Sequence, residues 1–284
     1  MIVVTGGAGF IGSAIVHELN VRGVSDILVV DQAGDPEKMK NLVPLKYREL
    51  RDKDQFLKEI LSRSLPKPDL ILHMGACSST TETDETYLRK NNFEYTRDLA
   101  VYALENDIRF IYASSAATYG SGGNGYSDDE SELERLQPLN AYGHSKHMFD
   151  LWAKRRNALD KIVGLKYFNV YGPNEYHKED MQSLVRKGFF QVGQTGKIRL
   201  FKSYKPDYGD GEQVRDFIYI KDAVAMTLFF AERPNVGGVF NVGTGTPRNW
   251  NDLARSIFAA LGKEPNIEYI EMPESIRPQY QYYT

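Results

Sequence analysis

Residues 1–12 read MIVVTGGAGFIG. This segment places a short β-branched run directly before three glycines spaced three residues apart, Gly6, Gly9 and Gly12. In a strand-turn-helix unit, the first glycine permits a tight turn, the second lets a pyrophosphate approach the backbone, and the third allows close helix packing. Asp31 follows the next apolar run, where an acid can hydrogen-bond the ribose of a bound adenosine. The segment therefore predicts a dinucleotide-binding site.

Short apolar runs alternate with longer amphipathic stretches over about the first 115 residues. The runs at 2–4, 27–30, 70–72 and 110–112 are followed later by 162–168 and 238–242. Such runs, separated by helical periods, indicate a parallel sheet covered by helices on both faces. We therefore predict an α/β protein with a Rossmann-type doubly wound parallel sheet and a smaller C-terminal α/β substrate lobe.

The length of 284 residues favours two lobes over one compact unit. We expect a cofactor-binding domain from residues 1–168 plus 216–242. The substrate-binding lobe is expected from residues 169–215 plus 243–284.

The composition excludes several classes of protein. A net charge of −3 provides no basic surface for nucleic acid, and no apolar stretch approaches the ~18 residues that cross a bilayer. The single cysteine, Cys77, excludes an intrachain disulfide, and the five histidines form no recognisable metal-ligand set. We expect a cytoplasmic protein that binds no nucleic acid, membrane or metal.

Tyr142 and Lys146 form a Tyr-x-x-x-Lys pair at the start of a predicted helix, and this spacing places both on one face. The pKa of a tyrosine is about 10, so a neighbouring ammonium and the positive charge of a cofactor are needed to favour the phenolate near neutral pH. Tyr142 is thus a candidate for proton exchange with a substrate hydroxyl. Ser115 stands at a strand end, where we expect it to hydrogen-bond the reacting oxygen; the alternative is local capping.

The residues alone leave the choice of cofactor open. Asp31 favours the free ribose hydroxyl of NAD, whereas Lys38 and Lys53 could neutralise the 2′-phosphate of NADP. The alternative for each lysine is a solvated surface charge.

The glycine turn, Ser115, Tyr142 and Lys146 together resemble the extended short-chain dehydrogenase/reductases, a superfamily that mostly remodels nucleotide sugars. Segments 73–82, 168–178 and 215–220 narrow this resemblance to the ADP-heptose 6-epimerases, and the likeness runs across essentially the whole chain. It implies an isomerase with NADP as cofactor that oxidises C6 of the heptose to an aldehyde and returns the hydride to the other face. It also implies a homo-oligomer, often a pentamer, and a place in assembling the inner core of lipopolysaccharide.

The resemblance also implies roles for individual residues. Ser115, Tyr142, Lys146 and Lys178 match the catalytic positions, with Tyr142 and Lys178 as the two acid/base groups; Lys178 would need its pKa lowered by burial or a neighbouring cation. The positions that match the cofactor site are Gly6, Gly9, Phe10, Ile11, Gly12, Asp31, Gln32, Lys38, Lys53, Gly75, Ala76, Cys77, Ser78, Asn91, Tyr142, Lys146, Val170 and Lys178. Cys77 is expected to be a packing residue and not a nucleophile.

The positions that match the substrate pocket are Ser115, Asn169, Asp180, Lys187, Phe201, Lys202, Ser203, Tyr204, Arg215 and Tyr280. Arg215 suits a bidentate grip on a diphosphate, the alternative being an ordinary salt bridge to Asp216 or another acid. The sequence departs from the family pattern at two of these places: Glu179-Asp180 replaces a smaller or less acidic pair in many relatives, and Lys187 stands where some have histidine.

Two other functions stay open. An epimerase or oxidoreductase acting on another nucleotide sugar shares the glycine turn and the Tyr/Lys pair, although a dehydratase is expected to carry an acidic pair where Ala116 and Ala117 stand. A cofactor-binding scaffold without activity would keep the fold but has little reason to keep all four catalytic positions.

Overall fold

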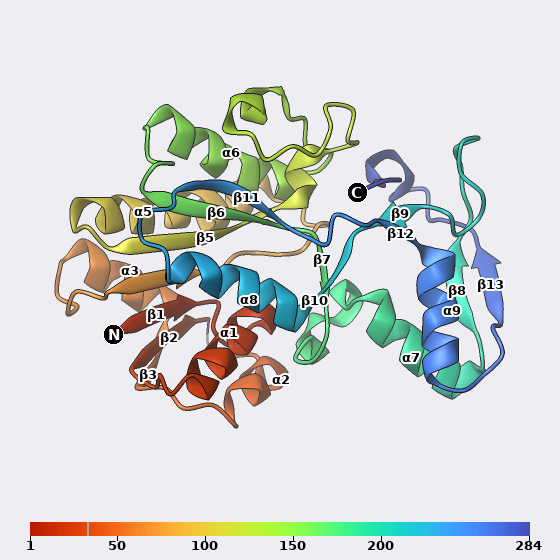
Figure 1. Ribbon diagram of the computed structural model, residues 1–284, viewed down its shortest axis with the longest axis horizontal. Helices are drawn as coiled ribbons and strands as arrows, with labels where there is room; N and C mark the ends of the chain where they lie inside the picture. Colours follow the sequence, from red (N-terminus) through yellow and green to blue (C-terminus); the bar gives the residue numbers. More distant parts are fainter. Residues whose placement is uncertain (33) are drawn as a thin grey trace.

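The computed structural model describes residues 1–32 and 34–284. Its centre is a seven-stranded parallel sheet in the order β11-β6-β5-β4-β1-β2-β3 (Figure 1). The strands are β1 (Ile2–Thr5), β2 (Ile27–Asp31), β3 (Glu49–Asp52), β4 (Leu70–His73), β5 (Arg109–Ser115), β6 (Ile162–Tyr167) and β11 (Gly238–Val242). The strand order reverses between β1 and β4, which is where doubly wound sheets bind their ligands. The predicted fold class is confirmed.

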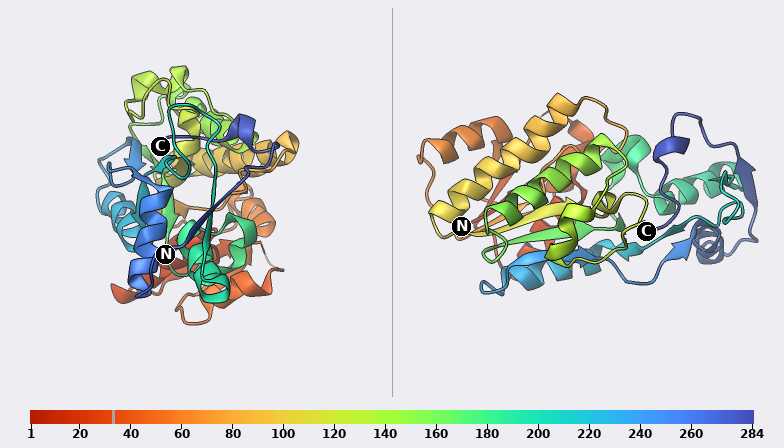
Figure 2. Two further views of the ribbon diagram at one scale, coloured as in Figure 1. Left: turned by 90° about the vertical axis from the view of Figure 1, so that its right-hand side faces the viewer. Right: turned by 90° about the horizontal axis from the view of Figure 1, so that it is seen from above.

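Helices cover both faces of this sheet, as Figure 2 shows for α5 and α6 on one side and α8 on the other. One face carries α3 (Lys53–Leu61), α5 (Tyr95–Glu105) and α6 (Ala141–Arg155), and the other carries α1 (Phe10–Val21) and α8 (Ile220–Ala231). Shorter helices are α2 (Pro36–Met39), α4 (Glu85–Leu88), the π-helix η2 (Arg89–Glu94) and the 3-10 helices η1 (Lys40–Leu42), η3 (Ala116–Tyr119), η4 (Glu130–Arg135), η5 (Tyr176–Met181) and η6 (Arg277–Gln279).

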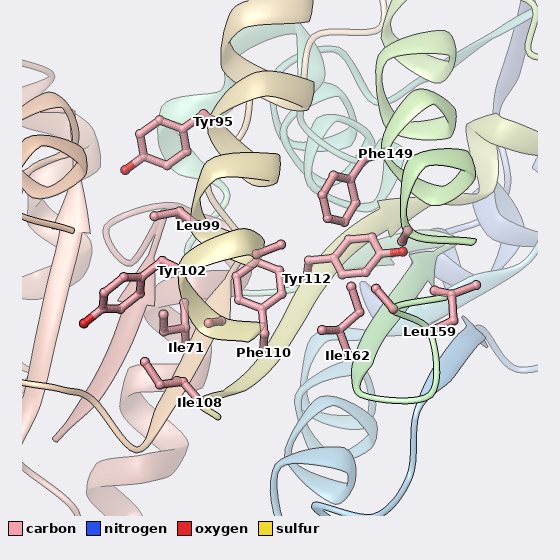
Figure 3. Packing of buried hydrophobic residues seen from close by; sticks show 14 of the residues in the cluster. Ile71, Tyr95, Leu99, Tyr102, Ile108, Phe110, Tyr112, Phe149, Leu159 and Ile162 are labelled. Atoms are coloured by element: carbon pink, nitrogen blue, oxygen red, sulfur yellow. The ribbon is translucent and has the colours of Figure 1, made fainter. Parts of the chain in front are cut away.

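The core on the α5 and α6 side is rich in aromatic rings (Figure 3). Phe110 and Tyr112 project from β5, and the Tyr112 ring meets Phe149 of α6 edge-on at 4.6 Å between centroids. Both rings of this pair are essentially inaccessible to solvent. This packing fixes α6, and with it the Tyr/Lys pair, against the strand that ends at Ser115.

Strand β3 is the strand of the main sheet that the sequence analysis missed. Its sequence is ELRD, its first two residues are exposed, and it pairs only with β2 at the sheet edge. An edge strand with one strand partner has no need of the apolar run that marks a buried parallel strand.

A smaller lobe packs its own core from Val192, Ile198, Leu200, Ala254, Ile257 and Phe258. Its elements are α7 (Leu184–Thr195), α9 (Trp250–Ala260) and the parallel pair β8 (Ile198–Phe201) and β13 (Ile267–Ile270). Two short strand pairs complete the chain, β7 (Asn169–Tyr171) with β10 (Phe217–Tyr219), and β9 (Val214–Arg215) with β12 (Arg248–Asn249). The exact domain boundaries stay a prediction. None of the helices described is long and apolar enough to span a membrane.

Candidate active site

The glycine turn between β1 and α1 depends on the absence of side chains. Gly6 has a φ of +64°, and a Cβ there would lie 2.7 Å from the Cα of Gly75. A Cβ on Gly12 would lie 2.1 Å from the Gly6 carbonyl oxygen. Gly9 is the N-cap of α1 and supplies no side-chain cap, so the first amides of the helix point at the turn with the positive end of the helix dipole. The turn therefore has the form of a phosphate cradle.

A cavity of about 450 Å³ opens beside this turn, at the carboxyl ends of β1, β2 and β4. Its volume lies in the range of small-molecule and cofactor sites. Fifteen of the residues predicted to bind the cofactor line it: Gly6, Gly9, Phe10, Ile11, Gly12, Asp31, Gln32, Lys38, Lys53, Gly75, Ala76, Cys77, Ser78, Asn91 and Lys178. Tyr142, Lys146 and Val170 are not part of this lining. The cradle and the cavity fit a dinucleotide cofactor.

His177 and Met181 also line the cavity, and the sequence analysis missed both. They lie on η5 on either side of Lys178, and η5 packs against α2 near the adenosine end. Their closeness to Lys178 in the sequence is the signal that could have found them, although the backbone kinks at Glu179 before Met181.

The carboxylate of Asp31 is fixed by three donors. Its Oδ2 accepts a hydrogen bond from the Ala8 amide at 2.9 Å, and its Oδ1 accepts from the Gln32 amide at 2.7 Å and from Lys38 Nζ at 2.5 Å. Lys53 Nζ lies 3.2 Å from Asn91 Oδ1. The side chains of Lys38 and Lys53 are about a quarter exposed and face the same cavity. Two ammonium groups thus stand at the end of the cavity where Asp31 ends β2.

Ser115, Tyr142 and Lys146 are brought together where β5 meets α6. Tyr142 lies in the first turn of α6, whose N-cap Asn140 accepts a hydrogen bond from the Gly143 amide at 2.7 Å. Ser115 forms a side-chain hydrogen bond with Tyr142, and its Oγ also accepts from the Ala117 amide at 3.1 Å. The local cap considered for Ser115 is present, and its hydrogen bond to the reacting oxygen stays a prediction. Lys146 Nζ donates to the Ala113 carbonyl at 3.0 Å.

Burial is the main influence on the pKa values of the Tyr/Lys pair. Burial raises the pKa of Tyr142 above its ordinary value, and the hydrogen bond with Ser115 opposes this only in part. Burial also lowers the pKa of Lys146 to about 8, against the opposing charge of Asp150. Burial thus disfavours the charged forms of both groups, and the expectation that Lys146 and the positive charge of a cofactor together favour the phenolate stays a prediction.

Lys178 reaches the cavity from η5, with its Nζ 5.3 Å from the centre of the Phe10 ring. Burial lowers the pKa of Lys178, while Glu175 raises it in part. Glu175 is 2% exposed and is held by the hydroxyl of Ser183 at 2.7 Å. The lowered pKa expected for this lysine is confirmed, and burial is the cause.

Arg215 is buried in the second lobe between two aromatic rings, with its guanidinium carbon 5.6 Å from the centre of Trp250 and 5.2 Å from that of Tyr280. Its guanidinium donates to the carbonyls of Val214 at 2.9 Å and Gln281 at 2.5 Å. Asp216 instead accepts hydrogen bonds from Thr244 and Gly245. The alternative of a salt bridge between Arg215 and Asp216 is therefore wrong, because the two side chains bind different partners.

The other predicted substrate residues fall into two groups. The first lies with Arg215 around β8 and the final residues: the rings of Phe201 and Tyr280 meet at 6.3 Å, and the Tyr204 amide donates to the hydroxyl of Tyr282. Beside them, Ser203 is held by Asp210, Lys202 pairs with Glu271, and Asn169 donates to Thr284. The second group is Asp180 and Lys187, which contact each other through Lys187 Nζ and the Asp180 carbonyl at 2.5 Å.

Comparison with known proteins places this geometry in a family. The family model described as the NAD dependent epimerase/dehydratase family matches residues 2–243. The chain belongs to this family. Curated relatives from Nitratidesulfovibrio vulgaris strain DP4 and Fusobacterium nucleatum, both called ADP-L-glycero-D-manno-heptose-6-epimerase, are 54% and 47% identical to it. These matches cover 100% of this chain and 88% and 89% of the two relatives.

A solved structure leads to the same family. The crystal structure of the ADP-L-glycero-D-manno-heptose-6-epimerase of Helicobacter pylori is similar with a TM-score of 0.81 and 30% sequence identity. The match covers 95% of this chain and 84% of that one. The site described above thus stands in a fold that this epimerase shares.

Proposed function

We propose that the protein is an isomerase that converts ADP-D-glycero-D-manno-heptose to ADP-L-glycero-D-manno-heptose by inverting the configuration at C6. The names of the relatives that match this chain over its whole length support the choice of substrate. The mechanism is supported by the positions of the two acid/base groups, which approach the site from opposite faces of the sheet. Tyr142 comes from α6 on one face of the sheet, whereas Lys178 packs against Phe10, which belongs to the core of the opposite face.

Inversion through a carbonyl requires proton transfer to the same oxygen in two orientations. A bound nicotinamide cofactor would supply the hydride chemistry at C6. Tyr142 accepts the proton of the C6 hydroxyl, while Ser115 holds the oxygen by a hydrogen bond. Once the aldehyde presents its other face, Lys178 provides the proton for the oxygen in its new position. Its lowered pKa, caused by burial, suits exchange nearer neutral pH.

We further propose that Arg215 holds the diphosphate of the substrate. Its guanidinium is flanked by two rings, and each terminal nitrogen donates to one backbone carbonyl and keeps a second N–H for a phosphate oxygen. Fixing the diphosphate in the second lobe orients the heptose towards the cavity, so that C6 meets Tyr142 and Lys178 in turn.

NADP is the proposed cofactor, because the ammonium groups of Lys38 and Lys53 face the cavity at the end of β2. Lys38 pairs with Asp31 and Lys53 pairs with the exposed Asp54, and a 2′-phosphate at this end of the cavity would accept hydrogen bonds from both ammonium groups. The cytoplasmic location and the homo-oligomeric assembly, often a pentamer in relatives, remain predictions from the resemblance.

The proposal is tested by incubating the purified protein with ADP-D-glycero-D-manno-heptose and following C6 by NMR, together with absorbance of reduced nicotinamide. We expect inversion without accumulation of reduced cofactor, and a fall in kcat of about 10²–10⁴-fold in Tyr142→Phe. A folded, NADP-saturated protein that leaves the sugar unchanged would contradict the substrate assignment. A panel of other nucleotide sugars would then identify the substrate.

A further inference from the structure

A charged pair lies directly beneath the catalytic groups and has no part in the mechanism given above. Asp150 of α6 and Lys166 of β6 have fully buried side chains, and Lys166 Nζ lies 2.8 Å from Asp150 Oδ2. A buried ion pair is costly to desolvate and is often replaceable by apolar residues without loss of stability. Its presence at this place calls for a function other than stability.

Both members of the pair are hydrogen-bonded to residues around Ser115 at the end of β5. Asp150 accepts hydrogen bonds from the Tyr112 hydroxyl at 2.9 Å and the Ser114 hydroxyl at 2.7 Å. Lys166 Nζ also donates to the Thr118 hydroxyl at 2.7 Å, and Thr118 donates to the Ser115 carbonyl at 2.8 Å. The pair therefore holds the backbone on both sides of Ser115.

The same carboxylate faces the catalytic helix. Tyr142, Lys146 and Asp150 are spaced by four residues on α6 and therefore lie on one face of that helix. Lys146 donates to the carbonyl of Ala113, next to the Ser114 that Asp150 holds. Asp150 is thus linked to the catalytic lysine both along the helix and across the strand.

We propose that Asp150 is a positioning residue for the catalytic pair: together with Lys166 it fixes the strand end that carries Ser115, and it faces Lys146 with a negative charge. This inference rests on the proposed function, because it assigns Asp150 a role towards the groups that carry that reaction.

The charges around Lys146 determine how its pKa should respond when Asp150 is replaced. Burial lowers the pKa of Lys146 to about 8, and the charge of Asp150 is the main opposing influence. The other titratable or charged groups near Lys146 or Asp150 are Tyr142, Cys77, His73, His147, Tyr112, Tyr119 and Lys166. Burial keeps His73 and His147 neutral by lowering their pKa values to about 3 and about 4. Asp150 is therefore the carboxylate among these groups.

The test measures the ionisation of Lys146 without substrate or turnover. Protein labelled with 13C at lysine Cε is titrated by NMR from pH 6 to 10, and the signals are assigned from Lys146→Met and Lys166→Met. We expect Asp150→Asn to lower the midpoint of Lys146 by about one pH unit, because a neighbouring negative charge is lost. Lys166→Met should leave this midpoint unchanged or raise it, since the charge of Asp150 is then unopposed.

The different responses of the Lys146 midpoint in the two variants separate an electrostatic role from damage to the fold. A merely structural pair predicts that both variants move the midpoint in the same direction, and this outcome, or no shift in Asp150→Asn, would overturn the proposal. Asp150→Glu keeps the charge and should keep the midpoint. If Asp150→Asn does not fold, Asp150→Asn/Lys166→Met replaces the ion pair with a neutral pair and should still lower the midpoint.

Kinetic measurements then test whether Asp150 affects the reaction through Lys146. The alkaline limb of kcat against pH should move to lower pH in Asp150→Asn, by the same amount as the NMR midpoint. An unmoved limb beside a shifted midpoint would overturn the role of Asp150 in the reaction. If the wild-type protein leaves the heptose unchanged while the midpoint shifts as expected, the substrate assignment fails and the link between Asp150 and Lys146 stands.

Discussion

Asn92 holds Cys77 by both polar groups of its backbone. The Oδ1 of Asn92 accepts a hydrogen bond from the Cys77 amide at 2.8 Å, and its Nδ2 donates to the Cys77 carbonyl at 2.9 Å. The same Nδ2 donates to Ser145 Oγ at 2.9 Å, and Ser145 donates to the carbonyl of Tyr142. A π-helix, which is common at functional sites, thus joins a loop of the cofactor cavity to the catalytic helix.

Replacing Asn92 should therefore weaken cofactor binding. Asn92→Ala leaves the polar groups of Cys77 without these partners, at a cost of about 1–3 kcal/mol for each group that stays buried. We expect a raised Kd for NADP⁺ and a lowered free energy of unfolding, measured by calorimetry and by denaturant titration. Asn92→Asp keeps the acceptor and should fall between Asn92→Ala and wild type. Equal affinity in all three proteins would show that the loop holds its shape without Asn92.

The two lysines of the cavity should decide between the cofactors. Lys38→Ala/Lys53→Ala removes both ammonium groups, so the Kd for NADP⁺ should rise about 10–100-fold. The Kd for NAD⁺, which lacks the 2′-phosphate, should change much less. Lys40→Ala is a matched control, because Lys40 is exposed and pairs with Glu37 on the surface. A protein whose affinities for both cofactors fall equally would contradict the assignment of NADP.

The buried imidazole of His73 should make the protein less stable in acid. Its two nitrogens lie 2.6 Å from Thr5 Oγ1 and 2.8 Å from Thr96 Oγ1, and burial lowers its pKa to about 3. Below a pH of about 6.5 the unfolded chain binds a proton that the folded chain does not, so His73 alone removes about 1.4 kcal/mol of stability per pH unit. This loss continues until the pH falls through the folded value.

Denaturant titrations between pH 7.5 and 4.5 measure this dependence. His73→Gln should lower stability at pH 7.5 and flatten its fall with decreasing pH, whereas His17→Gln, at an exposed position, should follow wild type. Equal slopes in wild type and His73→Gln would mean that His73 takes up a proton in the folded protein.

Arg215 should be sensitive even to replacement by lysine. Lysine keeps the charge but loses the planar fork that lies between Trp250 and Tyr280. Arg215→Lys should raise the Kd for the nucleotide sugar about 10–100-fold and leave the Kd for NADP⁺ unchanged, as measured by calorimetry. Arg199→Lys, on the exposed side of β8, is the matched control. An unchanged sugar affinity in Arg215→Lys would indicate that Arg215 only supports the C-terminal segment through Gln281.

The sequence predicts those features of the protein that are formed by residues close together in the chain. The glycine turn is recognisable because Gly6 and Gly12 have steric roles within one strand-turn-helix unit. The Tyr142 and Lys146 spacing follows from helical geometry, and the buried strands follow from their apolar runs. These features are contiguous in the sequence, and the fold confirms their arrangement.

The parts that escaped prediction depend on contacts between distant segments. Asn92 meets Cys77 only because a π-helix returns to the end of β4, and Lys166 meets Asp150 only because α6 packs on β5, the strand beside β6. The pKa of Tyr142 depends on burial, which a Tyr-x-x-x-Lys pattern does not reveal. The edge strand β3 lacks an apolar run because it is not covered like the central strands.

In the proposed mechanism, C6 is inverted by transient oxidation within one site. The direct measurement uses ADP-D-glycero-D-manno-heptose carrying deuterium at C6, incubated with the protein in ordinary water and followed by NMR and mass spectrometry. We expect an inverted product that retains its deuterium at C6, with no reduced cofactor released, and no such product from Tyr142→Phe. An inverted product with hydrogen from water at C6 would contradict transient oxidation, because it would show that C6 is inverted by removing and replacing a proton on carbon.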